Sequence, residues 1–152
     1  MEERRIRPIA LAVFRQEDRI LVAEGFDPVK PQTFYRPPGG GIEFGERAEA
    51  AMLREVYEEL GIRARSVGLV YVAENRFTYA GEPGHEIVFV FEAETEDPGL
   101  YALRCVAGME GDVPFSLVWL SLGVFSRETP LYPDGLHPVL AARTRAGPAN
   151  GS

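Results

Sequence analysis

The sequence contains a single cysteine, Cys105, among 152 residues. One cysteine excludes an internal disulfide and any all-cysteine metal site, so we expect Cys105 to be a small, at least half-buried hydrophobic side chain. No apolar run approaches the roughly 20 residues that a membrane-spanning helix needs. The first residues, Met-Glu-Glu-Arg-Arg, lack the basic-then-apolar order of a secretory signal peptide. These absences predict a cytoplasmic protein without a membrane-spanning segment.

Positive charge is also scarce. The chain has 16 Lys and Arg against 23 Asp and Glu, a formal net charge of −7. This balance argues against binding to a nucleic-acid polymer, which needs a basic surface. A small phosphorylated substrate is not excluded, because a bound metal ion reverses the local sign of charge.

The length suits one domain with a substantial core, and no repeat or linker divides the chain. We expect a single domain over residues 1–143. Residues 144–152 have few large apolar side chains and are expected to form a disordered tail.

Apolar segments separated by turn residues predict several strands around one central helix. We expect a hairpin of strands 6–14 and 20–23, a loop over 25–33 long enough to border a pocket and a short strand 34–36. After the helix we expect a strand 65–73, which 74–79 continues or pairs with as a hairpin partner, and a strand 85–94 whose residues 87–91 are buried on both faces. An irregular stretch 95–112 with room for a strand at 101–106, a last strand 116–120 and a helix 138–143 follow. This order predicts an α/β or α+β sandwich.

The central helix is expected from about Glu46 to Leu60, because this segment is rich in good helix formers and Gly61 supplies a left-handed stop. Glu55, Glu58 and Glu59 are spaced i, i+3 and i+4, so they share one side of the helix. No lysine in this helix offsets their repulsion. Spacing alone leaves two interpretations open, a solvated acidic face and a divalent-metal site with oxygen ligands.

A glycine-rich turn, Arg36-Pro-Pro-Gly-Gly-Gly41, precedes the helix. Glycines allow a backbone carbonyl or N–H to approach a metal ion or a phosphate closely. An ordinary strand-to-helix loop would also contain glycine, so the turn gains meaning only together with the carboxylates of the helix.

Turn and helix together resemble a complete Nudix box running from Gly40 to Ile62. The matching positions are Gly40, Glu46, Arg54, Glu55, Val56, Glu58, Glu59, Gly61 and Ile62. The preceding run also resembles the family pattern, except that Pro37 stands where a large apolar residue is usual. The resemblance implies a three-layer α/β/α sandwich with a mixed β-sheet.

The resemblance further implies a metal site for Mg²⁺ or Mn²⁺. Its ligands would be Glu55, Glu58, Glu59 and the carbonyl of Gly40. Glu58 or Glu59 would act as the general base, whose identity varies within the family. Arg54 joins Glu58 and Glu59 as a catalytic-site residue. We place Arg54 on a different side of the helix and expect it to anchor the turn by pairing with Glu46 or Glu43.

The substrate pocket is less well defined by the sequence. Aromatic and cationic side chains near the box could bind a nucleotide, and the candidates for substrate binding are Tyr35, Arg36, Arg76, Phe77 and Glu86, with Phe34 and Tyr79 as further aromatics. Glu86, Glu110 and Asp112 could complete the site, although a surface charge is the favoured interpretation of each. His85 is expected to be solvated or hydrogen-bonded.

We therefore expect a Nudix pyrophosphohydrolase that cleaves a nucleoside diphosphate linked to a further group. A MutT-like enzyme acting on a (deoxy)nucleoside triphosphate leads, ahead of one acting on ADP-ribose, nucleotide sugars or dinucleoside polyphosphates. A non-catalytic nucleotide-binding module is the alternative of another class, but such a module would be expected to have lost some of the three carboxylates. A homodimer is possible, and nothing in the sequence identifies its interface.

Overall fold

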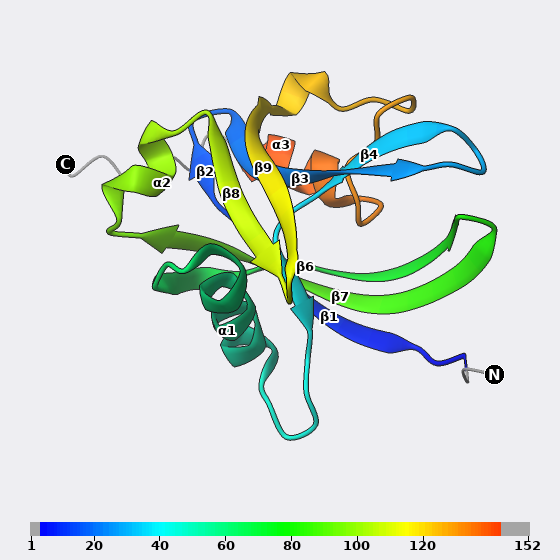
Figure 1. Cartoon of the computed structure of the whole chain (residues 1–152), viewed down its shortest axis with the longest axis horizontal. Helices are drawn as coiled ribbons and strands as arrows, with labels where there is room; N and C mark the ends of the chain where they lie inside the picture. The colour runs from blue at the N-terminus through cyan, green and yellow to red at the C-terminus, as the bar shows by residue number, and fades with distance from the viewer. Residues whose placement is uncertain (1–3, 144–152) are drawn as a thin grey trace.

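The strands of the computed structural model, which describes residues 4–143, form two sheets (Figure 1). The expected tail at 144–152 lies outside the described residues. The first sheet has the order β5–β1–β7–β6, made of Gly39–Gly41, Arg7–Val13, Glu82–Thr95 and Ala64–Tyr79. The second has the order β2–β3–β9–β8, made of Arg15–Gln16, Arg19–Asp27, Val113–Ser121 and Cys105–Glu110, and β4 (Gln32–Arg36) pairs with β3. The first sheet is mixed because β1 and β7 are parallel, whereas the other pairs are antiparallel.

Two apolar cores lie on opposite faces of the strands. Along β1 and just beyond it, Ala10, Ala12 and Phe14 enter the core beneath α1 (Ala48–Leu60). The alternate residues of the same strand enter the other core, which includes α3 (Leu136–Arg143). This period-two alternation explains why β1 is apolar on both sides. It yields the α/β/α sandwich with a mixed sheet that the sequence predicts.

The helix α1 begins at Ala48, two residues later than expected, and ends at Gly61, whose φ of 69° is left-handed as predicted. Glu46 is held in the preceding loop instead. Its N–H donates to the carbonyl of Glu43 at 2.9 Å, and its Oε1 accepts from the N–H of Glu43 at 3.1 Å. This local pairing competes with helix formation at Glu46.

The expected hairpin between strands 6–14 and 20–23 is wrong. Both edges of β1 are occupied, by β5 and by β7, so β3 pairs instead with β2 and β9 in the second sheet. The tight turn that the sequence predicts at 16–19 joins β2 to β3. Likewise the expected loop 25–33 is mostly strand, since β3 and β4 form a hairpin that turns over residues 28–31.

The stretch 95–112 is more regular than expected. It contains the short helix α2 (Pro98–Ala102) and strand β8, which starts at Cys105 rather than at Tyr101. Trp119 packs here as a core residue and donates its indole N–H to the carbonyl of Leu100 at 3.1 Å. Cys105 is exposed, so its expected burial is wrong.

The tips of two hairpins, β3–β4 and β6–β7, extend side by side away from α1 (Figure 1). Asp27 joins them, because its Oδ1 accepts hydrogen bonds from Val29 and Lys30 in its own turn and from Ala80 in the other hairpin, at 2.9, 3.3 and 3.2 Å. The hydroxyl of Tyr79 adds a bond to the carbonyl of Phe26 at 3.3 Å. A short 3-10 turn, η1 (Leu122–Val124), completes the elements. Among the described residues, no helix has the length and apolar character required to cross a membrane.

Candidate active site

The glycine run forms a short strand, β5, against β1, and this places it beside the carboxylates of α1. Gly39 has a φ of 144°, and a Cβ there would lie 2.1 Å from the carbonyl oxygen of Ala10. A Cβ on Gly40 would lie 2.6 Å from the Glu55 carboxyl group. Glycine is therefore required at position 39 by the backbone, and at position 40 it leaves space for a carboxylate.

Arg54 connects this strand, the loop before the helix and the acidic face of α1. Its guanidinium binds Glu46 through two hydrogen bonds of 2.8 and 2.9 Å and donates to the carbonyl of Gly41 at 3.0 Å. Its Nη1 also donates to Glu55 at 3.0 Å and to Glu58 at 3.3 Å. The predicted anchoring of the turn is thus observed as a contact. The placement of Arg54 on a separate side of the helix is wrong, because its long side chain reaches two of the three carboxylates.

This network shifts the proton affinity of its members. Hydrogen bonds from Arg54 lower the pKa of Glu46 to about 2. The same pairing raises the pKa of Arg54 above its ordinary value. Both groups remain charged at neutral pH, so the connection between loop and helix is a permanent ion pair.

The pKa of Glu59 is shifted in the opposite direction to that of Glu46. Burial raises its pKa to about 8, and repulsion from Glu55 and Glu110 adds to the effect. The backbone N–H of Gly39 and the charge of Arg36 act against this increase. Glu59 is therefore a buried carboxylate that lies near two others, Glu55 and Glu110, and holds its proton up to a pH of about 8.

The chemistry of these donors fits a hard divalent cation, which binds oxygen ligands and removes their repulsion. Their arrangement in the described chain does not yet form a metal cage, since no three Asp, Glu, His or Cys side chains in residues 4–143 converge on one point. Arg54 accounts for this, because it draws the carboxylates of Glu55 and Glu58 toward itself. The space beside Gly40 that a Cβ would fill is the place where a ligand set could close.

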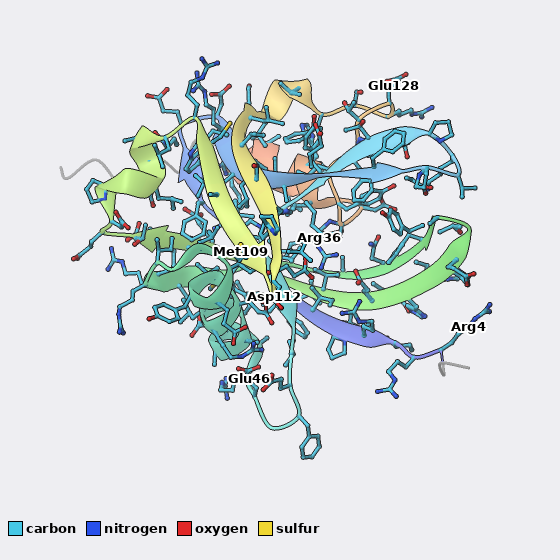
Figure 2. The ribbon with its side chains drawn as sticks, in the orientation of Figure 1. Arg4, Arg36, Glu46, Met109, Asp112 and Glu128 are labelled. Carbon is cyan, nitrogen blue, oxygen red and sulfur yellow. The ribbon has the colours of Figure 1, made fainter. Side chains whose placement is uncertain are left out.

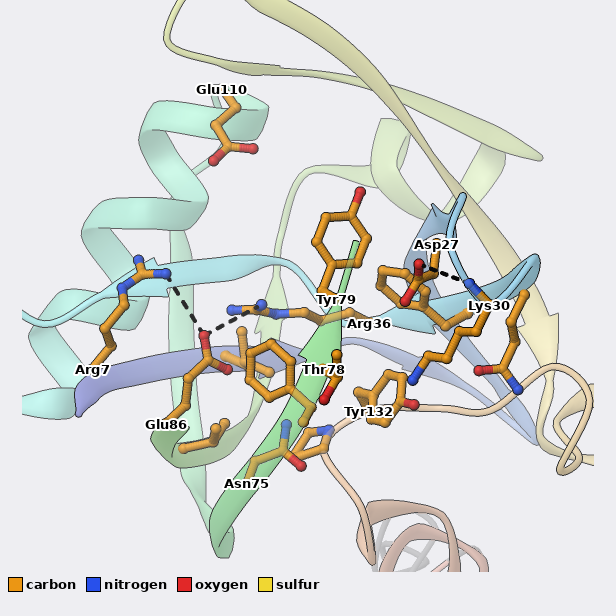
Figure 3. Close-up of a pocket in the computed structure, with 16 residues that line it drawn as sticks. Arg7, Asp27, Lys30, Arg36, Asn75, Thr78, Tyr79, Glu86, Glu110 and Tyr132 are labelled. Atoms are coloured by element: carbon orange, nitrogen blue, oxygen red, sulfur yellow. Dashed lines mark hydrogen bonds and ion pairs between the residues drawn. The ribbon is translucent and has the colours of Figure 1, made fainter. Parts of the chain in front are cut away.

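A cavity of about 440 Å³ lies between the two sheets (Figure 3). Among the described residues, the carboxylates of α1 do not line this cavity, but Arg36 and Glu110 do, and both act electrostatically on Glu59. The other lining side chains are of three kinds: polar or charged (Arg7, Asp27, Lys30, Gln32, Asn75, Thr78 and Glu86), aromatic (Phe34, Phe77, Tyr79 and Tyr132) and aliphatic (Leu11, Val88 and Pro133). Cavities of this size and mixed character are typical of small-molecule sites.

The alternation of β4 separates the substrate-binding candidates that precede the box. Phe34 and Arg36 face the cavity, and Tyr35 between them faces the other way. Tyr35 donates its hydroxyl to Glu24 at 3.1 Å and packs edge-on against Phe125 in the second core. The structure therefore does not bring Tyr35 to the candidate site.

Neighbouring side chains of β6 and β7 also point to different sides of the sheet. Phe77 and Glu86 line the cavity, whereas Arg76 lies in a neighbouring outer groove that also contains His85. His85 contacts Glu74 at 2.9 Å, so it is hydrogen-bonded as expected. Glu86 is only 4% exposed, so its favoured interpretation as a surface charge is wrong.

The two remaining acidic candidates differ in position. Glu110 lines the cavity near α1, and Asp112 is exposed at the β8–β9 turn, where Figure 2 labels it beside Met109. Asp112 is not among the residues that line the cavity.

Sequence reasoning missed several cavity residues, and Asn75 is the clearest. It is 5% exposed, and its carboxamide oxygen has no hydrogen-bond partner in the described structure. Burying such a group unpaired costs about 1–3 kcal/mol, so its presence needs an explanation. The available signal was a polar amide in the middle of an otherwise regular strand.

The family model described as the NUDIX domain matches residues 4–130. The chain therefore belongs to the Nudix family, and the resemblance carried by residues 40–62 is confirmed. The expected pyrophosphohydrolase is supported at the level of this family.

Similar proteins agree with the assignment. An RNA pyrophosphohydrolase of Mannheimia succiniciproducens is 32% identical over 71 residues, which are 47% of this chain and 34% of that protein. The match thus spans about a third of that relative's length. The crystal structure of a MutT NUDIX hydrolase from Burkholderia pseudomallei has a TM-score of 0.61 and 23% identity, covering 90% of this chain and 97% of that one. The crystal structure of an ADP-ribose pyrophosphatase from Streptococcus suis has a TM-score of 0.54 and 17% identity, covering 95% of this chain and 93% of that one. At these identities the two structures establish the fold alone.

Proposed function

We propose that this protein is a divalent-metal-dependent hydrolase that cleaves the diphosphate bond of a nucleoside diphosphate linked to a further group, with a (deoxy)nucleoside triphosphate as the leading substrate. The observation that carries the proposal is the carboxylate face of α1, formed by Glu55, Glu58 and the buried Glu59, whose pKa is raised to about 8. This face lies beside a glycine strand, and Arg36 and Glu110, which act electrostatically on Glu59, line a cavity of about 440 Å³.

Mg²⁺ or Mn²⁺ would be held by Glu55, Glu58, Glu59 and the carbonyl of Gly40. When bound, such an ion neutralises phosphate oxygens and lowers the pKa of a bound water. Arg54 would retain Glu46 and Gly41, its closest partners in the loop, and release the carboxylates of Glu55 and Glu58 to the ion. In this way one arginine would keep the site open before the metal arrives.

In the reaction, the oxygen of water bonds to phosphorus while the bond from phosphorus to the bridging oxygen breaks in line with it. Glu58 or Glu59 would accept the proton of the attacking water at a carboxylate oxygen. Arg36, at the boundary between cavity and carboxylates, would bind the phosphates and offset the charge that moves to the leaving oxygen. The products would be a nucleoside monophosphate and the phosphorylated remainder.

A second candidate substrate is the triphosphate at the 5′ end of an RNA chain. It is favoured by the name of the relative in Mannheimia succiniciproducens. It is also favoured by the outer groove next to the cavity, in which Arg4, Arg5 and Arg76 are exposed. Figure 2 shows Arg4 at the end of the molecule away from α1. This groove runs against the expectation, based on net charge, that no nucleic-acid polymer is bound.

The test is product release from a panel of nucleoside triphosphates, ADP-ribose, nucleotide sugars, dinucleoside polyphosphates and a short 5′-triphosphate RNA. Each is measured with Mg²⁺, with Mn²⁺ and with EDTA. We expect metal-dependent hydrolysis of the triphosphates, and ¹⁸O-labelled water will identify the phosphorus that is attacked.

The matched variants are Glu59→Gln and Glu49→Gln, which change the same residue type on the same helix. Glu49 is exposed in the first turn of α1. We expect a loss of at least about 100-fold for the first variant and no change for the second, in line with removal of a catalytic group. Turnover of ADP-ribose but not of triphosphates would replace the leading substrate. Nucleotide binding without any turnover would support the non-catalytic module instead.

A further inference from the structure

The cavity wall where β6 and β7 pair carries two buried polar side chains that lack matching hydrogen bonds. Asn75 and Glu86 are Cα partners across this ladder, so their side chains lie next to each other on the face that lines the cavity. They are 5% and 4% exposed. Among residues 4–143, the carboxamide oxygen of Asn75 has no hydrogen-bond partner. Figure 3 shows both residues at the same side of the cavity.

Two arginines near Glu86 compensate its negative charge, but neither is close enough to donate a hydrogen bond to it. Its Oε2 lies 3.8 Å from Nη1 of Arg7 and 4.0 Å from Nη1 of Arg36, both longer than a hydrogen bond. Within residues 4–143, no group donates a hydrogen bond to this carboxylate. The two arginines compensate its negative charge, so a ligand does not need to be a cation to bind here. The ligand needs neutral N–H donors.

The Asn75 carboxamide and the Glu86 carboxylate lie side by side, so together they limit which pattern of donors and acceptors a ligand can present to them. The Asn75 carboxamide offers an NH2 donor group and a carbonyl oxygen acceptor, and the Glu86 carboxylate offers acceptors only. The matching edge carries an acceptor followed by two adjacent donors. Among the four common RNA bases, guanine has this order, as O6, N1–H and the 2-amino group. Adenine, cytosine and uracil have no two adjacent donors on the corresponding edge.

We propose that Asn75 and Glu86 select a guanine base, so that the substrate is a guanine nucleotide. This inference rests on the proposed function and specifies its substrate. Phe77 and Tyr132 also line the cavity and supply aromatic surface for the base. Arg36 would bind the phosphates between the base and Glu59, because its Nη1 lies 4.0 Å from Oε2 of Glu86 and its charge acts on Glu59.

The experiment uses calorimetric binding of GMP, IMP, AMP, CMP and UMP to the metal-free protein in EDTA, which separates base selection from catalysis. GMP and IMP differ only by the 2-amino group. We expect GMP to bind at least tenfold more tightly than IMP and than the other three, because a polar site discriminates strongly against a ligand that leaves its groups unpaired. Equal affinity for GMP and IMP in the unmodified protein would overturn the proposal without any variant.

The informative variant is Asn75→Leu, with Glu74→Gln as its control. Glu74 is the preceding residue of β6, is exposed, and contacts His85 instead of the cavity. We expect Asn75→Leu to reduce GMP binding at least tenfold and to abolish the preference over AMP, while its unfolding midpoint is not lowered, because an unpaired buried polar group is removed. Glu74→Gln should keep the preference. A preference that survives in Asn75→Leu contradicts the inference.

The outcomes also separate the two proposals. Hydrolysis of nucleotides without any preference for guanine would refute base selection and leave the proposed function in place. Absence of both nucleotide binding and hydrolysis would refute the two together.

Discussion

At the scale of single residues, the difference between two adjacent glycines shows how closely the site is built. A Cβ on Gly40 would lie 2.6 Å from the Glu55 carboxyl group, whereas a Cβ on Gly41 would have no atom within 4 Å. The obstructing group is the flexible end of a side chain, so it can move aside. Moving it displaces a proposed metal ligand and leaves the fold intact.

We therefore expect Gly40→Ala to lower kcat at least about tenfold, with a loss of unfolding free energy of about 1 kcal/mol or less. Gly41→Ala should change kcat at most a few-fold. Steady-state kinetics at saturating Mg²⁺ and urea denaturation check the two halves of this prediction. Equal kinetic effects of the two variants would show that the space beside Gly40 has no role in the reaction.

The residues of the candidate site differ in how far the sequence could predict them. Glu55, Glu58 and Glu59 are close in the chain, so helical spacing places them together. Asn75 and Glu86 become neighbours only through the register of β6 with β7, which the sequence does not specify. Tyr35 was included because one strand residue cannot be assigned to a face without knowing its partner strand.

At the scale of elements, the sequence predicts those that depend on adjacent residues, but it does not predict which distant strands pair with each other. The helix α1 and its stop at Gly61 depend on adjacent residues and were predicted, apart from the two residues that the Glu46 pairing removes. The neighbours of β1 were not predicted, since one of them, β7, pairs with β1 across 79 residues of chain, as in Arg7 with Glu86. The alternation of apolar side chains indicates that a strand is buried on both faces, but it does not identify the strands beside it.

The two hairpins that frame the cavity are joined mainly by Asp27. Its carboxylate accepts three backbone N–H groups, and these bonds hold the pKa of Asp27 below its usual value against the effect of burial. Because Ala80 belongs to the other hairpin, losing this acceptor should loosen the hairpin tips relative to each other.

We expect Asp27→Ala to accelerate hydrogen exchange of the Ala80 amide at least about tenfold, since a charge-assisted bond contributes more than the 1.4 kcal/mol that corresponds to a factor of ten. Substrate KM should rise as the cavity widens. Asp112→Ala is the matched control, because Asp112 is exposed on another turn. Unchanged exchange at Ala80 in Asp27→Ala would mean that other contacts hold the hairpins.

At the scale of the whole molecule, the burial of Glu59 and the pairing of Glu46 with Arg54 make the free energy of unfolding depend on pH. Glu59 has a pKa of about 8 in the folded protein, against an ordinary value of 4.5. Between these values the folded state holds a proton that the unfolded state has lost, so the unfolding free energy falls as pH rises from about 4.5 to 8. Glu46 acts in a lower window, since its pKa of about 2 adds stability that is lost as pH falls from 4.5 toward 2.

In EDTA, we expect the unfolding midpoint of the unmodified protein to decline between pH 5 and 8 relative to that of Glu59→Gln. Mg²⁺ should reverse the decline, because metal binding favours the deprotonated carboxylate and stabilises the folded state by mass action. Thermal denaturation of both proteins across this range, with and without Mg²⁺, measures the effect. Parallel curves for the two proteins would show that Glu59 does not titrate in this window.

The separate anchoring of helix and hairpins also bears on how such a protein can change over evolution. Arg54 and the glycine strand fix the carboxylates through contacts with the loop before α1, whereas Asp27 fixes the two hairpin tips through contacts that α1 does not share. Mutations can therefore accumulate at the hairpin tips while the hydrolytic apparatus stays intact. A lineage of this kind can change how its substrate is enclosed by altering the two hairpin turns, and a protein engineer can follow the same route.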